Sequence, residues 1–210
     1  MRKNIHRKVL RIMKAINQPA GPQTTSAASM KYKGITTKNL VITAMMAAVT
    51  CVLGPLSLPL PFTPVPVSLT NFVIYLAAFV LTWKYCTLSY IVYVLLGAIG
   101  LPVFSGFGSG IDKIAGPTGG YLLGFVFTAL ICSIVNKKFV GKLYMYVAGM
   151  AAGLFVAYAF GTLWFMYQQG MGLKQSLALC VVPFLIGDAV KIAVASIVGP
   201  ALRKAVNAIQ

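Results

Sequence analysis

Acidic side chains are almost absent from this chain. Its 210 residues include only two of them, Asp112 and Asp188, and a single histidine, His6, near the N-terminus. Most enzyme active sites use carboxylates or histidine for proton transfer or metal binding. Because both are scarce here, we expect a protein that is not an enzyme, with no catalytic residue and no bound metal.

Paired cysteines are also lacking. The four cysteines occur singly in separate apolar runs, with neither a CxxC spacing nor a nearby histidine: Cys51, Cys86, Cys132 and Cys180. Disulfide frameworks and zinc sites need closely spaced or matched cysteines. We therefore expect these four to be small buried side chains without a disulfide or metal role.

Charged residues of either sign make up only 10% of the chain, whereas 59% of it is hydrophobic. The mean hydropathy of +0.84 is far above that of an ordinary soluble domain. The net charge of +16 comes from lysines and arginines at the ends of apolar runs, not from a basic stripe with interleaved aromatic residues. This pattern indicates a lipid bilayer as partner and argues against nucleic acid.

Six apolar runs predict an all-α integral membrane protein with six transmembrane helices. We expect the helices at about residues 37–54, 67–83, 85–101, 119–135, 143–167 and 176–200. With their loops they form one membrane domain, residues 37–204, followed by a short tail at 205–210. Ahead of it lies a basic, partly flexible extension at 1–36, either an amphipathic helix on the membrane surface or a solvated segment.

Lysine and arginine are distributed unequally between the two sides of such a bundle. Both termini, Lys84 and the turn at 137–142 fall on one side, whereas only Lys113 and Lys174 fall on the other. The positive-inside rule makes the first side cytoplasmic. We therefore expect a multi-pass protein of the plasma membrane with both termini in the cytoplasm.

Two uncharged or glycine-rich loops lie on the opposite side. Residues 54–66 hold five prolines and no charge, so they cannot form a regular helix and suit a rigid loop that serves as a lid or a pocket wall. Residues 102–121 are rich in glycine, which lets a backbone approach a ligand closely. Their glycines do not follow the phosphate-loop pattern, so a nucleotide site is not expected.

The fifth run contains small residues at four-residue spacing. They are Gly149 and Gly153, followed by Ala157 and Gly161. Small side chains in this arrangement let two membrane helices pack closely. We expect this helix to lie tightly against a neighbour.

The last apolar run contains the second acidic residue and a lysine three positions later, Asp188 and Lys191. Residues three apart share one face of a helix, so the two charges can meet. Charges inside a membrane segment are costly and usually functional. We interpret this pair as the floor of a small-molecule site; the alternative is a neutralised pair that only stabilises helix packing.

Four stretches, in order, resemble those of a known family: Pro64–Asn71, Gly100–Gly106, Gly116–Tyr121 and the Asp188/Lys191 pair. Together they are similar to the BioY family, the biotin-specific substrate-capture (S) components of energy-coupling factor (ECF) transporters. The resemblance extends from about Thr37 to Lys204. One departure is Thr70, where the family more often has glutamine.

This resemblance implies an ECF S-component bundle of six helices, with the ligand near the outer face under the first and third loops. It implies no cofactor, since biotin is the transported ligand. Energy would come from separate partners, two ATPase subunits and a transmembrane coupling protein. Small residues of the first helix face that protein in the family, and Ala44 and Ala48 match their AxxxA pattern; ordinary packing within the chain is the alternative.

Biotin offers a ureido ring, an apolar bicycle and a carboxylate, and the resemblance assigns residues to each. Asp188 can accept from the ureido N–H groups, and Lys191 can donate to the ureido carbonyl or balance the aspartate. Asn71 can both donate and accept a hydrogen bond, and Tyr93 can supply a ring face or a hydroxyl. The expected walls around the bicycle and tail are Phe62, Phe104 and Tyr121. The carboxylate is expected at backbone amides near Thr118, Gly119 and Gly120, at a helix N-terminus.

Other functions remain open on the residues alone. The same architecture could capture another small vitamin or a biotin precursor. A membrane enzyme and a self-sufficient transporter or channel are the other classes. The lack of histidine in the body of the chain and of a second membrane carboxylate argues against the enzyme. The absence of a visible inverted repeat argues against the independent transporter.

Overall fold

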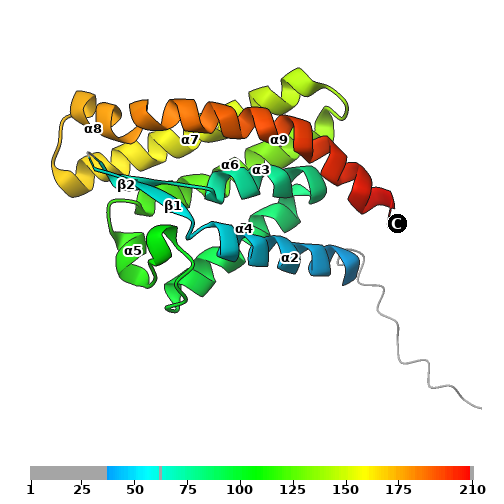
Figure 1. Ribbon diagram of the computed structural model, residues 1–210, viewed down its shortest axis with the longest axis horizontal. Coiled ribbons are helices and arrows are strands. Elements are labelled where there is room, and N and C mark those ends of the chain that lie inside the picture. Colours follow the sequence, from blue (N-terminus) through cyan, green and yellow to red (C-terminus); the bar gives the residue numbers. More distant parts are fainter. Residues whose placement is uncertain (1–36, 62, 209–210) are drawn as a thin grey trace, which may run out of the picture. The chain divides into compact units, whose positions relative to one another are not determined.

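The structure is a computed structural model that describes residues 37–61 and 63–208 (Figure 1). The expected extension at 1–36 lies outside these residues. The principal helices are α2 (Thr37–Leu53), α3 (Thr70–Val80), α4 (Trp83–Ala98), α6 (Gly119–Lys138), α7 (Leu143–Gln169) and α9 (Val182–Ala208). The shorter elements are β1 (Ser57–Leu60), β2 (Thr63–Ser68), the 3-10 turn η1 (Ser105–Phe107), α5 (Ile111–Ala115) and α8 (Leu173–Cys180).

Three of these helices, α6, α7 and α9, are long and apolar enough to cross a membrane by themselves. Large apolar side chains on the outside of the bundle are left exposed, among them Phe155 at 73%, Ile186 at 79% and Ile197 at 76%. Such a surface is unfavourable in water and favourable against lipid. The chain is therefore an all-α integral membrane protein.

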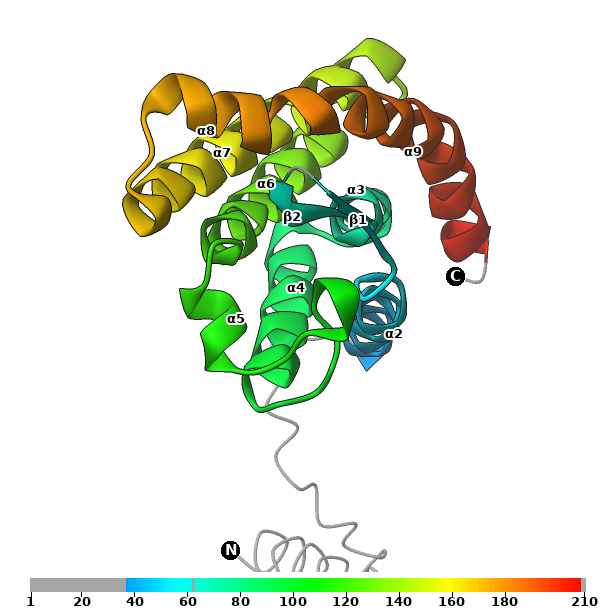
Figure 2. The same cartoon turned by 60° about the vertical axis from the view of Figure 1, so that its left-hand side comes forward.

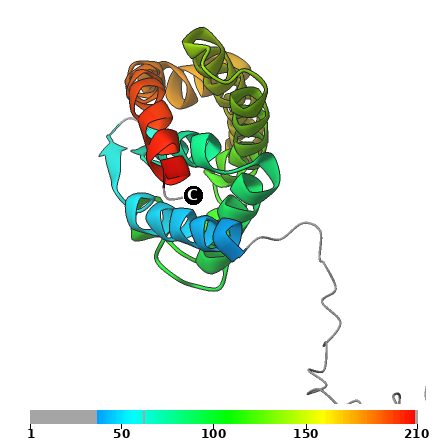
Figure 3. The same ribbon diagram turned by 90° about the vertical axis from the view of Figure 1, so that its right-hand side faces the viewer.

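Helix α3 lies at the centre of the bundle. It packs against α2, α4, α6 and α9, and the view along the bundle shows it enclosed by its neighbours (Figure 3). Most of its residues are buried, including Val73, Tyr75 and Phe79. With 11 residues at about 1.5 Å per residue, it is too short to cross a bilayer core of about 30 Å. It can nevertheless hold side chains inside the bundle.

Helices α6 and α7 form the most extensive helix pair, at the small residues that the sequence indicated. A Cβ atom built on Gly153 would lie 3.0 Å from Thr128 Cγ2, and one on Gly149 would lie 2.8 Å from Val135 Cγ1. The Thr128 hydroxyl donates to the carbonyl of Gly153 at 2.8 Å. Because Gly149 and Gly153 have no side chains, the backbone of α7 lies close enough to α6 for the Thr128 hydroxyl to donate to it.

The proline-rich segment forms a two-stranded antiparallel hairpin. Strand β1 pairs with β2 in a register that sets Ser57 opposite Ser68 and Leu58 opposite Val67. Prolines fit here because each strand of a two-stranded hairpin has a free edge that needs no N–H donor. This corrects the expected helix at 67–83: its first residues belong to β2, and α3 begins only at Thr70.

The expected sixth helix at 176–200 is also corrected. It is divided into α8 and α9, with a non-helical break at Val181 (φ −125°, ψ −55°). Pro183 lies in the first turn of α9, where its missing N–H costs no hydrogen bond. At the other end α9 runs to Ala208, through most of the expected tail at 205–210, because residues 201–208 consist mainly of good helix formers.

The hairpin, α5 and α8 gather at one end of the bundle, and the start of α2 and the end of α9 lie at the other (Figures 1 and 2). The guanidinium of Arg203 donates to the carbonyl of Asn136 at 3.1 Å. This contact places the C-terminal part of α9 beside the C-terminal end of α6. The two loops that the sequence singled out therefore share the end opposite the C-terminus.

The contact between α3 and α9 gives a test of the packing. A Cβ atom on Gly199 would lie 2.2 Å from the Phe79 ring, which packs edge-on against Tyr146 on its other side, with ring centroids 4.9 Å apart. Because the ring has little room to move, we expect Gly199→Ala to destabilise the fold by about 1–3 kcal/mol. Thermal unfolding in detergent would show a melting temperature several degrees lower.

A matched control lies on the same helix. A Cβ atom on Gly187 would meet nothing closer than Val67 Cγ1 at 4.0 Å. Gly187→Ala should leave the melting temperature unchanged or raise it slightly, because alanine favours a helix over glycine. Equal melting temperatures for the two variants would contradict the tight α3–α9 contact.

Candidate functional site

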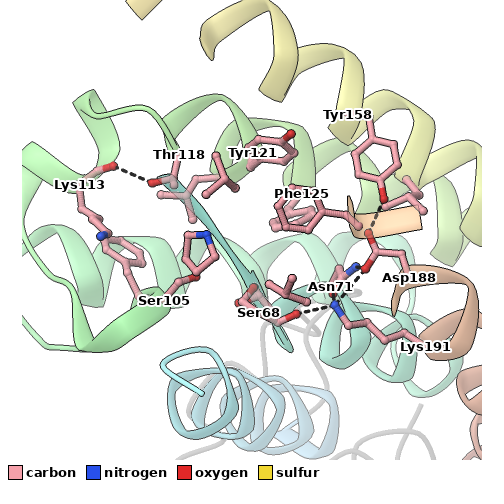
Figure 4. Close-up of a pocket in the computed structure, with 18 residues that line it drawn as sticks. Ser68, Asn71, Ser105, Lys113, Thr118, Tyr121, Phe125, Tyr158, Asp188 and Lys191 are labelled. Atoms are coloured by element: carbon pink, nitrogen blue, oxygen red, sulfur yellow. Dashed lines mark hydrogen bonds and ion pairs between the residues drawn. The ribbon is translucent and has the colours of Figure 1, made fainter. Parts of the chain in front are cut away.

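A cavity lies between β2, α3, α6, α7 and α9, at the end of the bundle that holds the hairpin. It encloses about 650 Å³ of space between its lining atoms, part of it open to the outside. Small-molecule sites are mostly apolar, with a few polar groups that set the ligand's orientation. Figure 4 shows that the polar side chains gather at two ends of the cavity, with aromatic rings between them.

The first end holds a cluster of four polar side chains, Asn71, Tyr158, Asp188 and Lys191, which we call the polar cluster. Lys191 Nζ lies 2.9 Å from Asp188 Oδ1, so the expected pairing of these charges on one face of α9 is present. Asn71 Nδ2 donates to the same carboxylate oxygen at 2.8 Å. Tyr158 donates its hydroxyl proton to Asp188 Oδ2 at 2.5 Å.

Lys191 is fully engaged within the protein. Its ammonium donates to Asp188 Oδ1, to Asn71 Oδ1 at 3.1 Å and to the carbonyl of Ser68 at 2.6 Å. An ammonium has three donor protons, so none remains for a ligand unless one of these bonds is exchanged. Of its two predicted roles, the structure therefore favours balancing Asp188 over donating to a ligand carbonyl.

Some hydrogen-bonding capacity of the polar cluster remains unused. A carboxylate has about four acceptor positions, and Asp188 uses three of them. The Tyr158 oxygen can accept a further bond, and Asn71 keeps one amide proton. The polar cluster can thus offer acceptors to two N–H groups and one donor to a carbonyl. Because Asp188 and Asn71 are only 4% and 3% exposed, such bonds would form with little competition from water.

The middle of the cavity is walled by apolar groups. Tyr121 and Phe125, both on α6, contribute rings at 6.5 Å between centroids. The Tyr121 hydroxyl donates to the carbonyl of Cys180 at 2.6 Å, and its ring fits against Gly161, where any Cβ would lie 2.4 Å from it. These contacts hold the Tyr121 ring in place as a fixed wall.

The second end is formed by the glycine-rich loop. Ser105, Lys113 and Thr118 line the cavity there. The Thr118 hydroxyl is 3.4 Å from the carbonyl of Lys113, a weak hydrogen bond across the last turn before α6. This end therefore carries one positive charge and two hydroxyl groups.

Six of the predicted ligand residues line this cavity: Asn71, Phe104, Thr118, Tyr121, Asp188 and Lys191. Tyr93 does not line it, since it is 1% exposed and lies behind Phe104, with ring centroids 5.6 Å apart. Phe62 lies outside the described residues.

Gly119 and Gly120 also do not line the cavity, and their role in the structure is packing. A Cβ atom on Gly120 would lie 2.3 Å from Trp164 Cβ, so this glycine lets α6 approach α7. The amide of Gly119 donates to the carbonyl of Gly116 at 3.0 Å, and that of Tyr121 to Thr118 at 3.1 Å. These two amides serve the turn into α6, so of the expected amides at residues 118–120 that of Gly119 already has a partner within the chain.

Sequence reasoning missed Tyr158, Lys113 and Phe125. Tyr158 gave no signal, because tyrosines are common in membrane segments whatever their role. Lys113 did give one, since it is one of the few cations on the outer side, and it lies in the glycine-rich loop. Ala44 and Ala48 lie elsewhere, exposed on α2 and away from the cavity.

Comparison with known proteins identifies close relatives. A profile of the BioY family matches residues 24–208. The protein named "Biotin transporter BioY" of Thermotoga maritima is 38% identical over 145 residues, which cover 69% of this chain and 85% of the relative. The "Probable biotin transporter BioY" of Pyrococcus horikoshii is 36% identical over 166 residues, covering 79% and 96%.

A solved structure agrees with these relatives. It is the crystal structure of the S-component for biotin from an ECF-type ABC transporter, and it resembles this fold with a TM-score of 0.75. The two share 31% sequence identity, and the match covers 80% of this chain and 92% of that one. The resemblance inferred from four sequence stretches is thereby confirmed, together with the fold class.

Proposed function

Because the chain belongs to the BioY family, we propose that it is the biotin-capturing S component of an ECF-type transporter. Its relatives are transporters, and the chain is accordingly a transport protein and not an enzyme. The observation that carries the choice of ligand is the polar cluster at one end of a largely apolar cavity. A ureido group has two N–H donors and one carbonyl acceptor, which is the complement of the capacity that Asp188, Tyr158 and Asn71 leave unused.

The cavity's apolar middle supports the same ligand. Biotin's bicycle and its four-carbon tail are apolar, and Tyr121, Phe125 and Phe104 line the space between the two polar ends. Burial against such walls contributes about 25 cal/mol per Å² of apolar surface. Binding energy would therefore come from the walls and orientation from the polar cluster.

The energising partners are a coupling protein and two ATPase subunits of an ECF module. The solved neighbour is an S-component of a transporter of this type, which supports the assignment. Among the described residues there is no glycine-rich phosphate loop that would let this chain use ATP itself. Ala44 and Ala48, exposed on α2, are the proposed contact with the coupling protein.

The location is the plasma membrane, with both termini cytoplasmic. The end of the bundle where α9 finishes beside α6 carries Lys137, Lys138, Arg203 and Lys204. The end with the hairpin and cavity carries few cations. The positive-inside rule then directs the cavity outward, where a ligand arrives.

Calorimetric titration of the purified full-length chain with biotin, in detergent and without any partner, tests the function. We expect saturable binding to one site per chain. Thiamin, a vitamin without a ureido group, should give no heat and serves as the control ligand. Absence of a biotin signal in protein that unfolds cooperatively would contradict the ligand; binding of another vitamin instead would keep the capture fold and change its cargo.

A further inference from the structure

We propose that Lys113 binds the carboxylate of the captured ligand and makes the site selective for a free acid over its uncharged esters and amides. This inference rests on the proposed function and adds the residue that binds the carboxylate end of the ligand. Lys113 lines the cavity at the end opposite the polar cluster (Figure 4). A ligand with a ureido group at one end and a carboxylate at the other therefore spans the two.

The charge of Lys113 is not neutralised within the described part of the chain. Two lysines line the cavity, Lys113 and Lys191. Lys191 is paired with Asp188 at 2.9 Å and uses its remaining protons on Asn71 and Ser68. Lys113 has neither an ion pair nor a side-chain hydrogen bond there. An anionic group entering the cavity therefore meets one uncompensated positive charge, at the glycine-rich loop.

The loop is shaped to hold this side chain. A Cβ atom built on Gly108 would lie 2.8 Å from Lys113 Cε and 3.1 Å from Cδ. The methylene groups of Lys113 thus lie directly against the backbone of Gly108, in space that any other residue would fill. Lys113 is half-buried in this position, with its methylene groups against the loop, so an anionic partner would meet a charge on a side chain that is already held in place.

The neighbouring groups suit a carboxylate. Ser105 and Thr118 bring hydroxyl groups to the same end of the cavity, and hydroxyls can donate to a carboxylate oxygen. The amides of Gly119 and Tyr121 cannot serve in their place, because they donate to the carbonyls of Gly116 and Thr118. With these two amides engaged in the turn, Lys113 is the group that brings a positive charge to this end of the cavity.

The experiment compares biotin with its uncharged amide, biotinamide, on four proteins: the unaltered chain, Lys113→Met, Lys113→Arg and Lys174→Met. We expect the unaltered chain to prefer the acid by about tenfold, the usual gain from a charge-assisted hydrogen bond in a partly buried site. Lys113→Met should lose this preference by weakening biotin alone, with the affinity for biotinamide unchanged. Lys113→Arg should keep it.

Lys174→Met is the matched control. Lys174 is exposed, lies on the same side of the bundle and does not line the cavity, so its removal changes the net charge equally and should leave the acid-to-amide ratio intact. An unchanged ratio in Lys113→Met would overturn the inference, and so would an equal loss in Lys174→Met, which would indicate only long-range attraction. If the unaltered chain bound neither compound, the proposed function would fail, and this inference with it.

Gly108→Ala gives a second, independent reading. The added methyl would displace the end of the Lys113 side chain and leave its charge in place. We expect the acid-to-amide ratio to fall part of the way towards that of Lys113→Met, with no change for biotinamide. A ratio equal to that of the unaltered chain would contradict the placement of Lys113 against Gly108.

Discussion

Asp188→Asn is expected to weaken biotin binding by at least about 1.5 kcal/mol, or roughly tenfold in the dissociation constant. Asp188 accepts from Asn71, Tyr158 and Lys191 and offers its remaining acceptor position to the ligand. An asparagine removes the negative charge and replaces one acceptor oxygen with a donor, so at least one of these contacts becomes unfavourable. Calorimetric titration of both proteins with biotin measures the effect.

Asp188→Asn also leaves Lys191, whose side chain is only 11% exposed, without its counter-charge, so a loss of stability must be separated from a loss of binding. Removing one partner of a buried pair costs about 3–5 kcal/mol, and the melting temperature in detergent reports it. Tyr158→Phe provides the milder variant, because it removes one hydrogen bond to Asp188 and no charge. It should weaken binding by about 1 kcal/mol with the fold intact.

The matched control is Asp112→Asn, at the only other acidic residue of the chain. Asp112 is exposed on α5 and does not line the cavity, so its neutralisation should leave affinity unchanged. If folded Asp188→Asn bound biotin as tightly as the unaltered chain, the polar cluster would serve helix packing alone. That alternative was already open on the sequence, and this comparison decides it.

The charged pair could be predicted because its geometry is local. Two residues three positions apart on a helix must share a face, and the structure brings Asp188 and Lys191 together on α9. The partners of the pair could not be predicted in the same way. Tyr158 comes from α7, thirty positions before Asp188, and only the packing of α7 beside α9 brings its hydroxyl to the carboxylate.

The hairpin shows a different limit of sequence reasoning. The prolines correctly predicted that residues 54–66 are not helical, but they do not indicate which residues the segment pairs with. Strand formation depends on the register between Ser57 and Ser68, a contact between two halves of the segment. The apolar run that begins at Val67 was therefore predicted to be helical from its first residue. Its first two residues belong to β2, so the start of α3 was predicted three residues early.

Glycines were the least predictable part of the site. A glycine can allow a ligand, a neighbouring helix or a turn to come close, and the sequence does not distinguish these uses. In the structure Gly120 accommodates Trp164, whereas Gly108 accommodates the side chain of Lys113. The first was expected at the ligand and lies against a helix; the second was not singled out and lies beside the cavity.

Bulky residues on the exposed face of α2 should block transport and spare binding. Ala44 and Ala48 are exposed there, next to Met45 at 61% and Val41 at 53%, whereas Thr43, Ala47 and Thr50 bury the opposite face. Packing within the chain therefore does not explain the small residues, and a helix of a partner could approach at them. We expect Ala44→Trp and Ala48→Trp to reduce biotin uptake by at least about tenfold, since a helix contact worth 1.4 kcal/mol would be lost.

Uptake of labelled biotin by cells that express the chain with its energising module measures the first effect, and titration of the purified variants measures the second. Ala152→Trp is the control, because Ala152 is also an exposed alanine but lies on α7, away from α2. It should change neither quantity. Normal uptake in the α2 variants would place the coupling contact elsewhere, whereas lost binding would mean that the tryptophans disturb the bundle; only blocked uptake with intact affinity supports α2 as the surface through which the ATPase module acts.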